Sequence, residues 1–238
     1  MSGWSRTARW MAAAAGVAAG GYATYAGVTW LRYGHPARPR PGEEDALLDD
    51  FISEYDVVER HRILVNAPGA MTLAAAQRVD FTDLPLAQAM FKGREFLLGA
   101  THVEQKSGAN LLESMQSMGW VVLAEIPGRE VVLGAVTRPW QANVVFRSIP
   151  PGEFRSFREP DYVKIAWTLR ADEAGDGQSV FRTETRAVAT DAEARAKFRR
   201  YWSFLSPGIF LIRMAMLRPV RAEAQRLAAR PRAEIPLE

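Results

Sequence analysis

Glu59 and His61 are the residues of this sequence whose types and spacing best suit acid–base chemistry. They belong to "EYDVVERHRILVNAP", residues 54–68, in which β-branched residues and a closing Pro-Gly predict a strand. Residues two positions apart on a strand share a face. If that face is inward, the carboxylate lies beside the imidazole and can orient it as a general base. The alternatives are an ion pair on an edge strand in water and a core histidine whose hydrogen bonds are satisfied.

Other kinds of chemistry find little support. The chain of 238 residues has no cysteine, which excludes disulfides, thiolate metal sites and cysteine nucleophiles. His102 and Glu104 stand in "HVE" without a third ligand at a suitable spacing, so no metal is expected. No phosphate loop, nucleophile elbow or dinucleotide fingerprint occurs, so no cofactor is expected. The net charge is only +3 and the arginines are spread along the chain, so nucleic acid is not an expected partner.

The stretch "WVVLAEIPGREVVLGAVTRPW", residues 120–140, predicts a hairpin that turns at Pro127-Gly128. Both of its faces are apolar along most of its length, so packing is expected on both sides. A four-residue loop fits L-Pro-Gly better than the tightest hairpin turn. The expected cross-strand pairs are Trp120 with Ala135, Val122 with Leu133, Ala124 with Val131, and Glu125 with Glu130 at the tip.

Two further strands are predicted in "DYVKIAWTLRA" and "SVFRTETRAVAT", with a short one in "NVVFRSI". The longer two alternate clearly, so their apolar sides should face a core. Their opposite sides carry charge, which we interpret as a cross-strand ladder in water. The expected inward residues are Val163, Ile165, Trp167, Leu169, Phe181, Thr183, Thr185 and Ala187, and the ladder comprises Arg182, Glu184 and Arg186.

Helical patterns flank these strands. Residues 70–91 predict two short helices separated at Pro85, and a long helix is expected from Asp191 to about Ala229. Thr190 and Glu193 have the spacing of a capping box at its start. Pro207-Gly208 should kink or break it. Its apolar stretch 201–217 could line a cavity, contact a membrane surface, or simply pack in the core.

The N-terminal region differs from the rest of the chain. Residues 10–31 contain no charge and are long enough to cross a bilayer, which predicts an uncleaved single-pass anchor. A cleaved signal peptide and a buried alanine-rich helix are the alternatives. Matched arginines on both sides leave the side of the membrane open. The expected parts are an anchor (1–33), a proline-rich linker (34–52), a domain (53–229) and a tail (230–238).

The order of elements, together with several phrases, resembles bacterial members of the SRPBCC superfamily, the START-like group of polyketide cyclases and lipid-transfer domains. The phrases are "RILVNAP", "GWVVLAEIPGREVVLGAVTRPWQ", "TETRAVATDAEARAKFRRYW" and "SPGIFLIRMAMLRPVRAEAQ". The resemblance implies an α+β helix-grip fold: a curved antiparallel sheet, two short helices after the first strand, and a long C-terminal helix. It also implies an apolar cavity between that sheet and that helix.

Three functions are compatible with this interpretation. The first is a membrane-tethered, noncatalytic binding or transfer protein for a lipid, isoprenoid or polyketide-like molecule. The second is a cyclase- or hydrolase-like enzyme that uses Glu59 and His61, and the third is an accessory subunit of a membrane protein complex. The residues expected to line the cavity are Glu59, His61, Val122, Ala124, Val131, Leu133, Ile165, Trp167, Thr183, Thr185, Phe210 and Met214.

Overall fold

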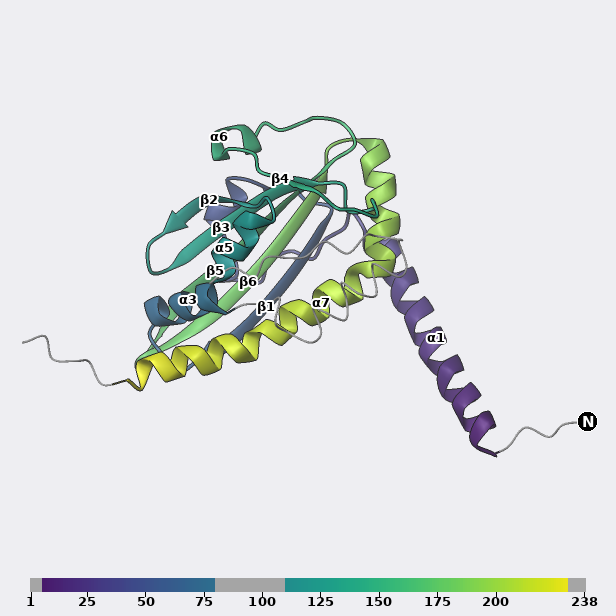
Figure 1. Cartoon of the computed structure of the whole chain (residues 1–238), viewed down its shortest axis with the longest axis horizontal. Helices are drawn as coiled ribbons and strands as arrows, with labels where there is room; N and C mark the ends of the chain where they lie inside the picture. Colours follow the sequence, from purple (N-terminus) through teal and green to yellow (C-terminus); the bar gives the residue numbers. More distant parts are fainter. Residues whose placement is uncertain (1–5, 80–109, 231–238) are drawn as a thin grey trace, which may run out of the picture.

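The computed structural model describes residues 6–79 and 110–230, and its elements are labelled in Figure 1. Strands β1, β6, β5, β3 and β2 lie in this order in one antiparallel sheet, and β4 pairs with β3. Helices α3, α5 and α7 pack on one face, here called the inner face. The architecture is α+β with a long C-terminal helix, which agrees with the helix-grip arrangement expected from the sequence.

The strands follow the alternation of the sequence. The inner face of β5 is apolar and its register with β6 is regular from Val163 to Glu173. Asp176 and Gly177 both have positive φ, as a two-residue hairpin turn between these strands requires. The bounds are β1 Val57–Val65, β2 Val121–Ile126, β3 Glu130–Thr137, β4 Phe146–Arg147, β5 Val163–Gly175 and β6 Gln178–Ala189.

The register of the β2–β3 hairpin was predicted only in part. Val122 pairs with Leu133 as expected, but Ala124 pairs with Val132 and not with Val131. A bulge between Val122 and Ala124 causes the shift. Ala124 therefore packs against the cluster on the outer face, and its expected place on the cavity wall was wrong.

The hairpin turn explains why a bulge is needed. The amide of Arg129 donates to the carbonyl of Ile126 at 3.0 Å, and Gly128 adopts a φ of +71°. Ile126 then pairs with Glu130, so the connection is one residue shorter than the expected four-residue loop. The expected meeting of Glu125 with Glu130 at the tip was also wrong for this reason.

The helices agree with the sequence in part. The first of the two short helices predicted after β1 is α3, and the second lies outside the described residues, as do His102 and Glu104. Helices α5 and α6 were not predicted from the sequence. The bounds are α1 Arg6–Arg32, α2 Ala46–Asp49, α3 Gly69–Arg78, α5 Leu111–Ser117, α6 Pro151–Phe154 and α7 Ala192–Ala228.

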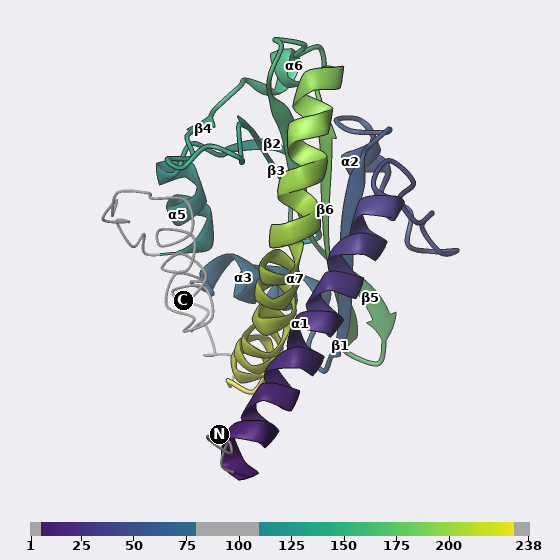
Figure 2. The same cartoon turned by 90° about the vertical axis from the view of Figure 1, so that its right-hand side faces the viewer.

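Helix α7 begins one residue later than the predicted capping box. Asp191 is the N-cap, and its carboxylate accepts from the amide of Ala194 at 2.8 Å. The hydroxyl of Thr190 instead donates to the carbonyl of Tyr162 at 3.0 Å. The helix continues beyond Pro207, which has no amide hydrogen to donate. Helix α7 changes direction between its first and last parts (Figures 1 and 2), which confirms the expected kink.

The segment 34–56, here called the strap, covers the outer face of the sheet. It includes α2 and the whole region expected to be a linker, residues 34–52. Leu48, Phe51 and Ile52 of the strap are buried in a cluster with outer-face residues of β2, β3 and β5. The strap therefore contributes core residues, and it provides the packing that the apolar outer face of the hairpin requires.

The strap also changes the environment of the predicted charge ladder. The guanidinium of Arg186 pairs with Glu184 and with Asp49 of the strap, and it donates to the carbonyl of Ile52 at 2.7 Å. Arg186 and Glu184 are 1% and 5% exposed, respectively. The expectation that these two residues lie in water was wrong, because the strap excludes water from them.

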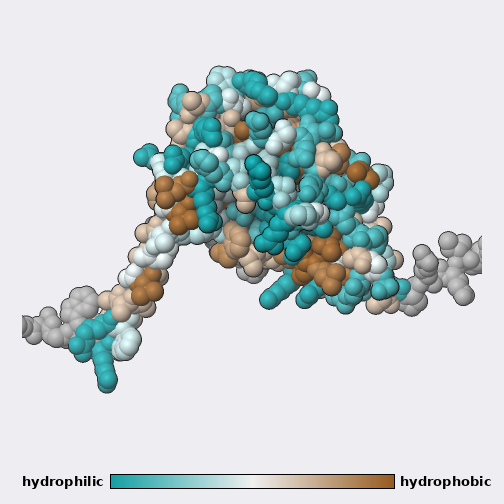
Figure 3. Space-filling view, turned by 180° about the vertical axis from the view of Figure 1, so that it is seen from behind, coloured by the Kyte–Doolittle hydropathy of each residue, from teal (hydrophilic) through white to brown (hydrophobic). Residues whose placement is uncertain are grey.

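Helix α1 extends away from the body of the molecule (Figures 1 and 3). Ala26 is its one buried residue among those described. Helix α1 contacts α7 through two tyrosines. The hydroxyl of Tyr22 donates to the carbonyl of Phe204 at 2.5 Å, and the hydroxyl of Tyr25 hydrogen-bonds to that of Ser206 at 3.0 Å. These bonds join α1 to the first half of α7.

Among the described helices, α7 has the length and apolar character to cross a membrane, and α1 does not meet the same criterion. A core helix of a soluble domain also meets it, and α7 buries several residues in this domain, including Phe198, Met216 and Val220. The criterion does not support the anchor expected in residues 10–31.

Candidate functional site

A cluster of polar side chains lies on the inner face of the sheet, below α7. Val65 of β1 belongs to the inner core and Ile63 packs against it. Glu59 and His61 share their face of the strand, so they also point inward. The Oε2 of Glu59 lies 3.7 Å from the Nε2 of His61, and their side chains are 18% and 8% exposed. The inward placement expected for this pair is therefore what the structure shows.

Strands β5 and β6 extend the cluster across the sheet. Thr185 of β6 lies between Glu59 and Trp167 in the strand register, and Thr183 lies beside His61. The indole Nε1 of Trp167 donates to the hydroxyl of Thr183 at 2.6 Å. Among the described residues, the Oγ1 of Thr185 and the Nε2 of His61 are buried without a hydrogen-bond partner. Native interiors rarely leave such atoms unpaired.

Helix α7 contributes a cation to this cluster. The guanidinium carbon of Arg213 lies 3.7 Å from the centroid of the Trp167 ring. This is a cation–π arrangement over a fully buried ring. Phe210, one turn earlier on α7, packs its ring 5.1 Å from that of His61.

Burial dominates the electrostatics of the cluster. It raises the pKa of Glu59 to about 7, against a smaller lowering by the charge of Arg213. Burial also lowers the pKa of His61, and Arg213 lowers it further, so the imidazole is neutral at pH 7. The pKa of Arg213 falls to about 9 through burial, which leaves the guanidinium charged at pH 7. The cluster thus has a cation, a neutral imidazole and a partly protonated carboxyl.

The structure separates the predicted lining residues into three groups. Glu59, His61, Thr183, Thr185 and Trp167 come together in the polar cluster, and Phe210 packs against it through His61. Val131 and Leu133 are fully buried in the inner core, while Val122 and Ile165 are partly buried against it. Two predicted residues are not part of the inner core: Ala124 lies on the outer side, and Met214 is 47% exposed. The buried methionine of this part of α7 is Met216.

Sequence reasoning missed Arg213 as a site residue. A signal was present, because Arg213 is the one charged residue between Tyr201 and Leu217. It precedes the buried Met216 and Val220 by three and seven residues, which is the spacing of one helical face. A charged residue on the apolar stripe of a core helix is therefore a candidate site residue, as is a charged residue on the inner face of a strand.

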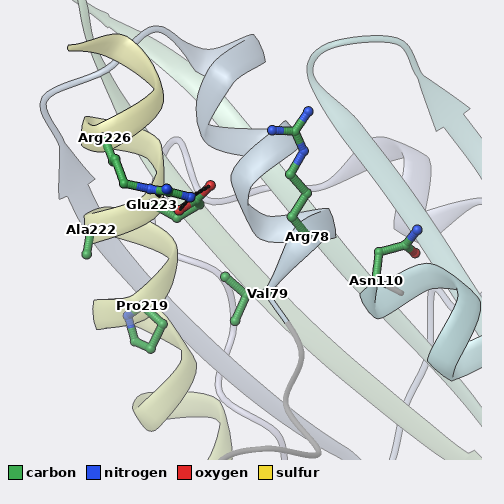
Figure 4. Close-up of a pocket in the computed structure, with 7 residues that line it drawn as sticks. All are labelled: Arg78, Val79, Asn110, Pro219, Ala222, Glu223 and Arg226. Carbon is green, nitrogen blue, oxygen red and sulfur yellow. Dashed lines mark hydrogen bonds and ion pairs between the residues drawn. The ribbon is translucent and has the colours of Figure 1, made fainter. Parts of the chain in front are cut away.

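Two cavities lie on opposite faces of the sheet. A cavity of about 790 Å³ opens between α3, α5 and the second half of α7 (Figure 4). A second, of about 400 Å³, lies mainly below the strap on the outer face and reaches His61 and Thr183 at the β1 edge. The residues lining the larger cavity are Arg78, Val79, Asn110, Pro219, Ala222, Glu223 and Arg226. None of the predicted lining residues is among them.

A metal centre finds no basis in the described part of the chain. Residues 6–79 and 110–230 contain no group of three or more histidine or acidic side chains placed to hold an ion.

Comparison with known proteins gives distant structural neighbours. No protein-family model and no curated protein sequence matches the chain. The di-domain ARO/CYC BexL from the BE-7585A biosynthetic pathway aligns at 13% identity and a TM-score of 0.31, over 73% of this chain and 48% of that one. The hypothetical protein jhp0584 from Helicobacter pylori aligns at 8% identity and a TM-score of 0.33, over 74% of this chain and 93% of that one.

A third neighbour is the Zhui aromatase/cyclase from Streptomyces sp. R1128, with 13% identity and a TM-score of 0.22, over 71% of this chain and 93% of that one. The chain thus spans about half the length of the di-domain protein, and most of the length of the other two. All these TM-scores are below 0.5, so the helix-grip assignment depends on the element order and sheet described above.

Proposed function

We propose that this protein binds a hydrophobic small molecule of the lipid, isoprenoid or polyketide-like kind, between the inner face of the sheet and α7. Binding sites of this sort combine apolar walls with a few converging polar groups. The polar cluster supplies such groups, and α7 supplies the apolar wall.

The observation that carries the proposal is the pair of unpaired buried atoms next to exposed apolar side chains. His61 Nε2 and Thr185 Oγ1 are buried without a partner among the described residues. Phe210, which packs on His61, is 39% exposed, and Leu211 is 46% exposed. A molecule with a polar end and an apolar body would satisfy the first pair of groups and cover the second.

Co-purification tests the proposal. The full chain is purified, its bound compounds are extracted into organic solvent, and they are identified by mass spectrometry. The variant Phe210→Asp puts a charge on the apolar wall and should retain at least about tenfold less compound, because a buried or shielded carboxylate is strongly disfavoured there. Phe204→Asp is the matched control, since Phe204 is 50% exposed and lies before the kink.

Two results would contradict the proposal. One is equal retention of compound by the Phe210→Asp and Phe204→Asp variants. The other is a wild-type protein that carries no compound and shows no saturable uptake of added palmitic acid.

An enzyme of the cyclase or hydrolase kind is the second candidate, and the Glu59–His61 pair favours it. The two side chains approach within 3.7 Å, and the neutral imidazole can accept a proton while a protonated Glu59 can donate one. Incubation of the extracted compound with wild-type protein and with His61→Gln tests this function. Conversion by the wild type alone, with equal binding by both proteins, would establish catalysis; unchanged compound would leave binding as the function.

A membrane tether through residues 10–31 belongs to the same proposal. Its support is that this part of α1 has no charge and that Val17 is 78% exposed. Flotation with vesicles of phosphatidylcholine and phosphatidylglycerol tests it. Val17→Glu should reduce flotation roughly tenfold or more, since a charge within the apolar layer is costly. Ala37→Glu, in the exposed part of the strap, should float as the wild type does. Equal flotation of both variants would reject the tether, and a stoichiometric protein partner bound through α1 would favour an accessory subunit.

A further inference from the structure

Arg213 is a cation that forms no ion pair with any acidic side chain in the described part of the chain. Its side chain crosses from α7 to the Trp167 ring on β5. Within residues 6–79 and 110–230, its guanidinium makes no ion pair and no hydrogen bond to another side chain or to the backbone. The other arginines that reach the sheet, Arg60, Arg170 and Arg186, all pair with carboxylates.

The nearby carboxyl does not neutralise this charge fully. Glu59 is the acidic group whose charge acts on Arg213. Its own pKa is raised to about 7 by burial, so at neutral pH it is only partly ionised. The side chain of Arg213 is half-buried. A guanidinium carries only donors, and it needs an acceptor to offset the water that it loses there.

The groups around Arg213 are suited to oxygen atoms. Glu59, Thr185 and Trp167 form one row across three neighbouring strands, and Arg213 lies over the Trp167 end of that row. The hydroxyl of Thr185 and the Nε2 of His61 are buried and unpaired, and both can donate. Three donor groups thus lie at one place on the inner face, next to the exposed apolar residues of α7.

We propose that the ligand is an amphipathic acid, with its carboxylate on Arg213 and its apolar chain against the exposed side of α7 near Phe210. This rests on the proposed function and names its ligand class. Arginine is the side chain best suited to a carboxylate, because its planar fork can donate two parallel hydrogen bonds. Thr185 and His61 would donate to the same oxygens, and a protonated Glu59 would not repel them.

A comparison of matched ligands tests the proposal. Calorimetric titrations of the full chain use lauric acid and lauryl alcohol, which share a chain and differ in the head group. The wild type should bind the acid at least about tenfold more tightly, in the range of a charge-assisted hydrogen bond. Arg213→Met keeps an unbranched side chain and should bind both ligands equally. Arg218→Met, at an exposed position of the same helix, should keep the preference.

The outcomes separate this inference from the proposed function. If acid and alcohol bind the wild type equally, or if Arg213→Met keeps the preference, the acid assignment is wrong while ligand binding stands. If neither ligand binds, both are wrong. Circular dichroism shows whether Arg213→Met folds, and Arg213→Gln replaces it if it does not.

The pH dependence gives a second readout. The titratable groups of the cluster are Glu59 and His61 on β1 and Arg213 on α7, while β5 and β6 contribute Trp167, Thr183 and Thr185, which do not titrate. A bound carboxylate favours the protonated form of Glu59, so affinity for lauric acid should fall between pH 6 and pH 8, where Arg213 stays charged, by at most about tenfold per pH unit. Glu59→Gln should bind the acid with little change over this range. A wild-type affinity that rises with pH, or the same fall in Glu59→Gln, would overturn the proposal.

Discussion

Two buried threonines differ in whether their hydroxyls have a hydrogen-bond partner. The hydroxyl of Thr168 donates to Glu130 at 3.1 Å, on the outer face below the strap. The hydroxyl of Thr185, on the inner face, has no partner among the described residues. An unpaired buried hydroxyl costs free energy, whereas a paired one recovers that cost.

Substitution by valine should therefore act in opposite directions at these positions. Thr185→Val should raise the free energy of unfolding of the ligand-free protein by about 1 kcal/mol, and Thr168→Val should lower it by about 1–2 kcal/mol. Urea denaturation of both variants at one pH provides the measurement. Destabilisation by Thr185→Val would show that its hydroxyl is satisfied without a ligand.

Glu130 makes stability depend on pH. Burial and the neighbouring carboxylate of Asp45 raise its pKa to about 7, above the ordinary value of 4.5 for a glutamate. The folded state therefore holds a proton that the unfolded chain releases, and the stability from this group falls as pH rises from 4.5 to 7.

Removal of the ionisable group should remove this dependence. Between pH 5 and pH 8, Glu130→Gln should gain roughly 1–3 kcal/mol in unfolding free energy relative to the wild type. Glu125→Gln, on the same hairpin but exposed, should follow the wild type at both values. If the difference in unfolding free energy between Glu130→Gln and the wild type is the same at pH 5 and pH 8, folding does not raise the pKa of Glu130.

The residue alternation was sufficient to place Glu59 and His61 inward, because a strand's period leaves only two choices of face. It was not sufficient to find Arg213, whose role depends on the ring of Trp167, forty-six positions earlier. It also misplaced Ala124, because one bulge moves a strand residue to the opposite face.

At the scale of elements, the strap is joined to the sheet through the buried guanidinium of Arg186, which also pairs with Glu184 within β6. Arg186 contacts both Glu184 and Asp49, while Arg155 pairs with Asp50 on the surface at 3.6 Å, with side chains 56% and 60% exposed. Removal of one partner from a buried pair leaves an uncompensated charge, whereas exposed pairs contribute little.

Arg186→Met should lower the free energy of unfolding by about 3 kcal/mol, and Arg155→Met by less than about 0.5 kcal/mol. Hydrogen exchange should become faster at the amides of Leu48 and Ile52 in the first variant only, because the strap would detach more often. Similar exchange in the two variants would show that apolar packing, not Arg186, holds the strap.

The strands and α7 could be predicted because their apolar periods are long and regular. The strap could not, since its prolines and charges resemble those of a free linker, and its apolar residues gain meaning only against the outer face. Helix α5 was hidden for a similar reason: its seven residues are too few to show a period.

At the scale of the whole molecule, the candidate site depends on elements far apart in the sequence. Glu59 and His61 come from β1, Trp167 from β5, Thr185 from β6 and Arg213 from α7. Helix α7 follows a kinked path along the sheet (Figures 1 and 2), and its Arg213 lies over the ring of Trp167. We propose that a ligand occupies this place.

Isoleucine methyl NMR of the full chain with palmitic acid tests that claim most directly, because these methyls mark both sides of the sheet. Ile63 and Ile165 pack on the inner core, whereas Ile52 and Ile149 are buried in the outer cluster. We expect nuclear Overhauser contacts from the ligand chain to Ile63, Ile165 or Ile209 on α7, and none to Ile52 or Ile149. Contacts confined to the outer pair, or no saturable binding, would contradict the account.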